Sequence, residues 1–164
     1  HRALVDLDHQ DKLHTLITQN VDGLHQDAGT SPEKVVEIHG TARSVRCMSC
    51  DYRAPIGVAL ERVRSGEADP PCPRCGGILK SATISFGQGL VAEDLARCQQ
   101  AALECDLMFA IGTTLAVFPI ASVVPVALRA GAKVMILNAE PTEMDDLAEV
   151  VLRGRIGEVL PALL

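Results

Sequence analysis

The sequence predicts an α/β protein built on a parallel sheet, with a small domain inserted between two of its strands. Short apolar runs alternate with helical stretches along most of the chain, and two Cys-x-x-Cys pairs interrupt that alternation. Strands that alternate with helices through short connections typically form a parallel sheet. Paired cysteines at this spacing typically belong to a compact insert that binds a metal ion.

The spacing of apolar residues and the residues that end each run predict the individual elements. Helical spacing, with breakers such as Pro119 at a first turn and Gly131 at an end, predicts the helices. Short apolar runs predict the strands, and the uninterrupted run at residues 107–111 predicts a central parallel strand. In chain order we expect a helix at 1–8, strands at 13–18 and 35–38, a helix at 55–65, a strand at 79–86, a helix at 91–104, a strand at 107–111, a helix at 119–130, strands at 133–137 and 150–152, and a helix at 156–164.

The composition is that of a folded chain. Hydrophobic residues make up 48% of the 164 residues and aromatic residues only 2%, so aliphatic side chains must fill the core. Scarce aromatics and a net charge of -6 argue against direct nucleic-acid binding. No apolar run reaches the roughly 18 residues of a membrane span, because Pro119 and Pro125 interrupt the longest candidate.

Four cysteines form the most specific metal-binding pattern. Cys47 and Cys50 are followed, after 21 residues, by Cys72 and Cys75. Two such pairs can offer four thiolates to one tetrahedral Zn(II), which leaves no open coordination position. The pattern therefore predicts a structural zinc ion in a zinc-ribbon domain at residues 47–76. It also predicts a reducing compartment, which we take to be the cytoplasm.

Polar side chains follow the first two predicted strands directly. Gln19, Asn20 and Asp22 follow the first strand, and His39, before Gly40, follows the second. The carboxyl ends of parallel strands meet at one edge of an open α/β sheet, where ligands bind. Amide and carboxylate groups suit a neutral, hydroxyl-rich ligand, and a neutral histidine can accept a proton near pH 7. A polar loop beside an ordinary surface histidine also fits these residues.

Two later strands also end in groups that suit a nucleotide. Glycine and hydroxyls at a strand end can bind phosphate or ribose, and an acid or amide there commonly meets the ribose hydroxyls of a dinucleotide. A simple turn is an equally good reading of the first of these strand ends. The residues are Gly112, Thr113, Thr114, Asn138 and Glu140.

Taken together, these motifs resemble those of the sirtuins, the NAD-dependent protein lysine deacylases. The resemblance implies a Rossmann-like NAD-binding domain at residues 1–46 and 77–164, with the functional site between it and the zinc domain. The matching stretches occur in the family's order: Thr18-Gln19-Asn20-Val21-Asp22-Gly23-Leu24-His25, Glu37-Ile38-His39-Gly40, the four cysteines, Phe86-Gly87-Gln88, Ile111-Gly112-Thr113-Thr114-Leu115 and Leu137-Asn138-Ala139-Glu140.

The resemblance also implies roles for individual residues. His39 would be the general base, acting through the hydroxyls of the nicotinamide ribose, with Gln19 and Asn20 orienting that ribose. Asp22 would hold the nicotinamide carboxamide. Further NAD contacts are expected from Gly112, Thr113, Thr114, Asn138, Glu140 and Ile156. Contacts to the substrate peptide are expected from Phe86, Gly87, Gln88, Val117, Phe118 and Pro119.

The implied reaction removes an acyl group from a protein lysine. The acyl oxygen attacks C1′ of the ribose as nicotinamide leaves, and water then yields free lysine and O-acyl-ADP-ribose. The motif holds Asp22 and neutral amides but no Lys or Arg, so it does not oppose the positive charge that develops at C1′. Thr114 stands where many sirtuins have Ser, and Gln88 where Glu is usual. Acetyl is the default acyl group.

Two other functions are compatible with the same motifs. The first is an NAD-dependent protein ADP-ribosyltransferase, for which nicotinamide release would not require an acylated peptide. The second is a non-catalytic NAD- and zinc-binding module, for which His39→Ala would change nothing measurable.

The sirtuin segment that holds the first strand and the Gly-rich pyrophosphate turn has no counterpart in these residues, and the chain has no initiator Met. We therefore expect a longer parent protein and a Rossmann-like sheet that is incomplete at its N-terminal end. We predict that the 164 residues alone bind NAD weakly and turn over poorly, because half of the NAD site is missing. Calorimetric titration with NAD tests this, and a micromolar affinity would contradict it.

Overall fold

The computed structural model describes residues 1–164. The helices are α1 (Arg2–His9), α2 (Leu24–Ala28), α3 (Ile56–Arg64), α4 (Ala92–Glu104), α5 (Val123–Ala130) and α6 (Ile156–Leu163), with 3-10 turns η1 (Pro32–Lys34), η2 (Ile120–Ser122) and η3 (Asp145–Leu147). The strands are β1 (Leu16–Thr18), β2 (Val35–Glu37), β3 (Gly40–Cys47), β4 (Arg53–Pro55), β5 (Leu79–Thr83), β6 (Leu107–Ile111), β7 (Lys133–Leu137) and β8 (Val150–Leu152). None of the helices combines the length and the hydropathy needed to cross a bilayer.

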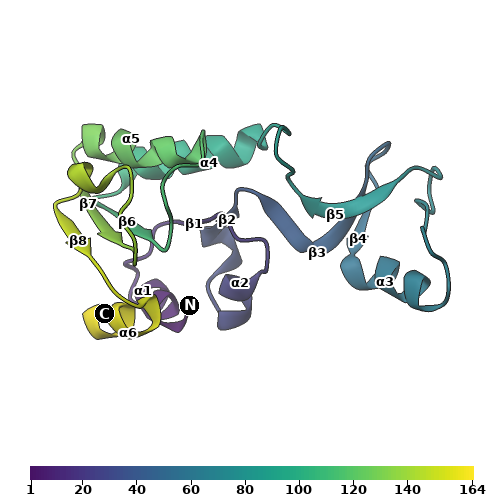
Figure 1. Cartoon of the computed structure of the whole chain (residues 1–164), viewed down its shortest axis with the longest axis horizontal. Coiled ribbons are helices and arrows are strands. Elements are labelled where there is room, and N and C mark those ends of the chain that lie inside the picture. Colours follow the sequence, from purple (N-terminus) through teal and green to yellow (C-terminus); the bar gives the residue numbers. More distant parts are fainter.

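The molecule is elongated and has two parts (Figure 1). One part contains the parallel strands, with α4 and α5 along one side and α1 and α6 on the other. The other part contains the antiparallel strands β3, β4 and β5 together with α3. This arrangement confirms the predicted fold class, a parallel α/β sheet with a small inserted domain.

The parallel strands form two groups. β7 pairs with β6 on one side and β8 on the other, and β1 pairs with β2. The helix and strand types predicted for the second half of the chain are confirmed, and β7 has the predicted bounds. The expectation that residues 107–111 form a central strand is wrong, because β6 lies at the edge of its sheet and Leu107 is 45% exposed. Of the five residues of β6, only Ala110 is buried.

Small and branched aliphatic residues fill the main core. Cys98 and Ala102 of α4 and Ala127 of α5 are fully buried against Val134 and Ile136 of β7. Alanine lets a helix backbone approach the sheet closely, so this core needs no aromatic residue. Cys98 is therefore a core residue and not a ligand of the cysteine cluster.

The small part is built on the antiparallel sheet β4-β3-β5. α3 packs on this sheet and confirms the predicted helix at 55–65. β3 was not predicted, because its sequence mixes polar residues with only one isolated valine, Val45, before the first cysteine. β3 and β5 continue to Gly40 and Thr83, beyond the 47–76 range predicted for the zinc domain.

Three predicted elements differ in length or type from the observed ones. The strand predicted at 13–18 begins only at Leu16, and the strand predicted at 79–86 ends at Thr83. Phe86 lies in a turn and is fully exposed. The first turn of the helix predicted at 119–130 is the 3-10 turn η2, and Gly131 ends the helix with φ of 99° as expected.

A buried ion pair joins α1 to η1. Asp8 is only 5% exposed. Its carboxylate lies 2.7 Å from Lys34 Nζ and accepts a hydrogen bond of 2.8 Å from the Ser31 N–H. The Lys34 hydrogen bond, followed by that from Ser31, lowers the pKa of Asp8 from 3.8 to about 2. The folded state therefore favours the ionised form of Asp8.

We predict that this pair makes stability depend on acid pH. Because the pKa of Asp8 is lower in the folded state, its contribution is fully present above pH 3.8 and is lost as the pH falls toward 2. Asp8→Asn should lower the unfolding temperature at neutral pH and flatten its decline below pH 4, as measured by circular dichroism. The matched control is Asp6→Asn, on an exposed position of α1. An equal decline in the wild type and Asp8→Asn would contradict the assignment.

Candidate active site and zinc centre

Three of the predicted site residues meet at the carboxyl ends of the parallel strands. Gln19 follows β1, His39 lies two residues after β2, and Thr113 follows β6. The Gln19 Nε2 donates to Thr113 Oγ1 at 3.4 Å, and His39 Nδ1 lies 3.3 Å from the Gln19 carbonyl oxygen. The structure therefore brings together groups that lie up to 94 residues apart in the sequence.

The contact with Gln19 determines which nitrogen of His39 can act as a base. A carbonyl oxygen only accepts hydrogen bonds, so Nδ1 must carry the proton in this contact. The other nitrogen, Nε2, is then unprotonated in the neutral ring and can accept a proton. The His39 carbonyl also accepts a hydrogen bond of 2.8 Å from Ile84 N, which fixes the main chain at this residue. His39 is half-buried.

The loop after β1 presents Asn20 and Asp22 to solvent. Asn20 N donates to Thr18 Oγ1 at 3.1 Å, and Leu24 N donates to Asp22 Oδ1 at 3.0 Å. The Asp22 side chain thus satisfies an N–H of the first turn of α2, and its other oxygen is free for a ligand. Gly23, between Asp22 and Leu24, has φ of 72°, a conformation that favours glycine.

The turn after β6 lets another chain approach its backbone closely. Gly112 has φ of 61°, and a Cβ at this position would lie 2.6 Å from Ile156 Cδ1. Thr113 Oγ1 accepts a hydrogen bond of 3.2 Å from Leu115 N, and Thr114 is exposed. Ile156 therefore touches the turn, as its predicted place in the same site requires.

Asn138 and Glu140 lie after β7, beside this turn. Gly112 N donates to the Leu137 carbonyl at 2.9 Å, which joins the ends of β6 and β7. Asn138 Nδ2 donates to the Glu140 main-chain carbonyl at 2.8 Å, and Glu140 is exposed. Arg153 was not singled out from the sequence, but it donates to the Asn138 carbonyl at 3.3 Å.

The two stretches predicted to hold a peptide are exposed but do not touch each other. Phe86 is fully exposed, and Gln88 closes the turn by bonding Ser85 through its main chain at 2.9 Å and its side chain at 3.3 Å. Phe118 is 62% exposed and is joined to Pro119 by a cis peptide bond, after half-buried Val117. Two exposed aromatic side chains are thus available on separate segments.

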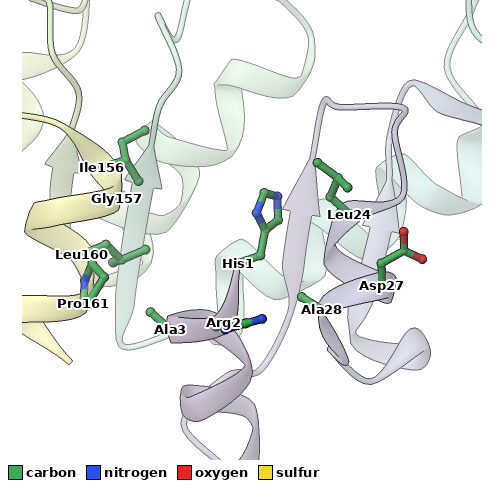
Figure 2. A pocket seen from close by; sticks show the side chains of 10 residues that line it. All are labelled: His1, Arg2, Ala3, Leu24, Asp27, Ala28, Ile156, Gly157, Leu160 and Pro161. Atoms are coloured by element: carbon green, nitrogen blue, oxygen red, sulfur yellow. The ribbon is translucent and has the colours of Figure 1, made fainter.

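A pocket of about 570 Å³ adjoins this region and was not predicted from the sequence. Figure 2 shows Ile156, Gly157 and Leu160 of α6 on one side and Leu24 and Asp27 of α2 on the other. The His1 ring points between them and lies 4.6 Å from the His25 ring. Ile156 lines this pocket and touches Gly112, so the pocket borders the strand-end turn.

The four predicted zinc ligands lie together at the far end of the small part. The four sulfurs lie within 4.8 Å of one another, with Cys47 and Cys75 at 3.5 Å and Cys50 and Cys72 at 3.7 Å. A tetrahedral Zn(II) with bonds of about 2.3 Å needs sulfurs about 3.8 Å apart, so these distances fit the ion. The Ser49 N–H, 3.3 Å from the Cys47 sulfur, contributes most to lowering the pKa of that thiol to about 6.

The fold and these two sites define a class of protein: a Rossmann-like, nucleotide-binding α/β domain that carries a four-cysteine zinc module. Residues 1–119 match the model of the Sir2 family. NAD-dependent protein deacetylase 2 of Streptomyces coelicolor is 47% identical over 164 residues, which are 100% of this chain and 68% of that protein. The chain belongs to the Sir2 family.

Other relatives and solved structures agree with this assignment to the Sir2 family. The NAD-dependent protein deacylase of Thermococcus kodakarensis is 40% identical over 167 residues, which cover 100% of this chain and 64% of the relative. A solved Sir2 structure with a p53 peptide and NAD+ has a TM-score of 0.93 and 28% identity, covering 99% of this chain and 67% of that one. A Sir2 protein bound to a propionylated peptide gives the same TM-score and identity, with 99% and 68% coverage. The chain thus spans about two thirds of each of these proteins.

We predict that the four cysteines bind one zinc ion that the small part needs to fold. In the full-length protein, Cys72→Ala should reduce the metal content from one zinc per chain to near zero, measured by mass spectrometry of the metal. The loss of about 10 kcal/mol of metal-linked folding energy should also unfold the small part. Cys98→Ala, in the core of the other part, is the control and should retain its zinc. Full zinc content in Cys72→Ala would contradict the ligand set.

Proposed function

We propose that the full-length protein is an NAD-dependent protein lysine deacylase in which His39 is the general base. The observation that carries this proposal is the meeting of Gln19, His39 and Thr113 at the strand ends. The names of the relatives support it, because the Streptomyces and Thermococcus proteins are called NAD-dependent deacetylase and deacylase.

The residues at the strand ends fit NAD in their chemistry. Gly112 offers an open backbone, Thr113 and Thr114 offer hydroxyls, and the Glu140 carboxylate is exposed beside them. We assign the phosphates and the adenosine ribose to these residues together with Asn138 and Ile156. Gln19, Asn20 and Asp22 then lie on the side of His39 and suit the nicotinamide ribose and carboxamide. NAD, when bound, supplies a C1′ carbon that becomes electrophilic as nicotinamide leaves.

His39 can move the proton that this chemistry requires. Its Nδ1–H is held by the Gln19 carbonyl, so Nε2 is the nitrogen that accepts a proton from a ribose hydroxyl. A carboxylate at Asp22 favours the positive charge that develops at C1′. Cys47, Cys50, Cys72 and Cys75 would hold a zinc ion through four thiolates, and the ion would then shape the small part.

We assign the acylated-lysine substrate to the exposed edges at Phe86-Gly87-Gln88 and Val117-Phe118-Pro119. An extended peptide can add to such edges through its main chain, with its lysine directed toward His39. Solved relatives with acetylated and propionylated peptides support a substrate of this kind. We propose the cytoplasm as the compartment, because the six cysteines are free and four of them are arranged for a metal ion.

We predict that the full-length protein releases nicotinamide and O-acetyl-ADP-ribose from NAD only with an acetyl-lysine peptide present. His39→Ala should lower kcat by a factor of about 100 or more, because a general base is lost. Mass spectrometry of both products measures the reaction. The control is His14→Ala, an exposed histidine on the loop before β1.

Two other outcomes of this experiment would change the proposal. Nicotinamide release without peptide would favour ADP-ribosyl transfer or NAD hydrolysis. An equal rate in the wild type and His39→Ala would overturn the role assigned to His39.

A further inference from the structure

A β-bulge lies beside the loop assigned to nicotinamide. β3 pairs with β5 at Thr41↔Ala82 and resumes at Val45↔Ser81, so three residues of β3 face no partner on β5. Ala42 N instead donates to the Val21 carbonyl at 2.8 Å, and Arg43 N donates to Thr41 Oγ1 at 3.3 Å. Bulges next to functional sites commonly redirect a side chain. Here the redirected side chain is that of Arg43.

The Arg43 guanidinium holds the loop at two points. Its Nε donates to the Asp22 carbonyl at 2.8 Å, and its Nη1 donates to Asp27 Oδ1 at 2.6 Å, while Nη2 bonds the other oxygen of Asp27. The paired contact with Asp27 uses the planar fork that arginine has and lysine lacks. Arg43 thus joins β3 to Asp22 in the loop before α2 and to Asp27 in α2 itself.

Gly23 makes this approach possible. It is buried, and a Cβ at this position would lie 2.1 Å from Arg43 Nε. The guanidinium therefore packs directly on the loop backbone between Asp22 and Leu24. This contact with the main chain distinguishes Arg43 from an ion pair formed only by two mobile surface side chains.

Three carboxylates surround this one cation. The hydrogen bond that Arg43 donates to Asp27 is the main cause that raises the pKa of Arg43, and the charges of Glu37 and Asp22 add to it. The Glu37 Oε1 is buried without a hydrogen-bond partner. The sequence motif contains no Lys or Arg, but the fold brings one from strand β3. Its charge is balanced locally by Asp27.

We propose that Arg43 is a positioning residue that holds the Asp22 loop in the geometry needed to bind and release nicotinamide. This role rests on the proposed function, in which Asp22 binds the nicotinamide carboxamide. The side chain of Arg43 donates hydrogen bonds only to Asp22 and Asp27, so it acts on the ligand through the loop.

The test measures nicotinamide as an inhibitor of the full-length protein. Arg43→Lys keeps the charge but loses the fork and the Nε contact, so the inhibition constant of nicotinamide should rise about tenfold, the effect of one charge-assisted hydrogen bond. The KM for NAD should rise with it, while the KM for the acetyl-lysine peptide should stay within about twofold. Asp27→Asn should act in the same direction. The double variant should be no worse than the more affected single variant, because both remove one contact.

The matched control is Arg46→Ala, three positions further along β3, which is exposed and makes no side-chain hydrogen bond. It should leave all three constants unchanged. An inhibition constant for Arg43→Lys equal to that of Arg46→Ala would overturn the role of Arg43. So would a uniform rise of every constant together with a lower unfolding temperature, since that is the pattern of a purely structural contact.

The wild type separates this proposal from the proposed function. Peptide-dependent nicotinamide release by the wild type supports the function whatever the Arg43 variants do. If the wild type binds NAD without reacting, calorimetric titration with nicotinamide makes the same comparison of variants, and an unchanged affinity in Arg43→Lys overturns the role. Absence of NAD and nicotinamide binding by the wild type would overturn both proposals.

Discussion

The parallel pairing of short strands is the constraint on which the arrangement of the site depends. β1 and β2 pair from Leu16↔Val35 to Thr18↔Glu37, and Ile38 N continues the pairing to the Thr18 carbonyl at 3.1 Å. Parallel strands must end on the same side, so the residues that follow them meet there without any sequence proximity. The hydrogen bond between the Gln19 carbonyl and His39 is a direct consequence of this pairing. Loss of register in these three-residue strands would therefore displace Gln19 and His39 together.

The sequence alone predicted the features that local patterns control. Residues 133–137 form a strand and 92–104 a helix because each has its own clear periodicity and its own ending residues. The zinc ligands were also predictable, because the chemistry of four thiolates requires little beyond two Cys-x-x-Cys pairs. The family motifs led to the correct family, and the residues at the strand ends lie where an open α/β sheet binds ligands.

The features that the sequence did not reveal depend on contacts between distant segments. The edge position of β6 is a property of the sheet and not of its own apolar run. β3 has a weak strand pattern, and its bulge arises where the strand leaves β5 to bond Val21. Arg43 had no signal of its own, because an arginine on an exposed strand resembles any solvated charge. Its contacts with the Asp22 carbonyl and with Asp27 distinguish it from Arg46.

Two chain crossings connect the two parts of the molecule, and both pass next to His39. β3 begins at Gly40, directly after His39, and Gly40 pairs with Thr83 at the end of β5. Ile84 N then bonds the His39 carbonyl at 2.8 Å. Any rotation of one part against the other about these crossings displaces each atom in proportion to its distance from them. Such a rotation would therefore displace His39 least, because it lies beside the crossings. It would displace the four cysteines most, because they lie at the far end of the small part.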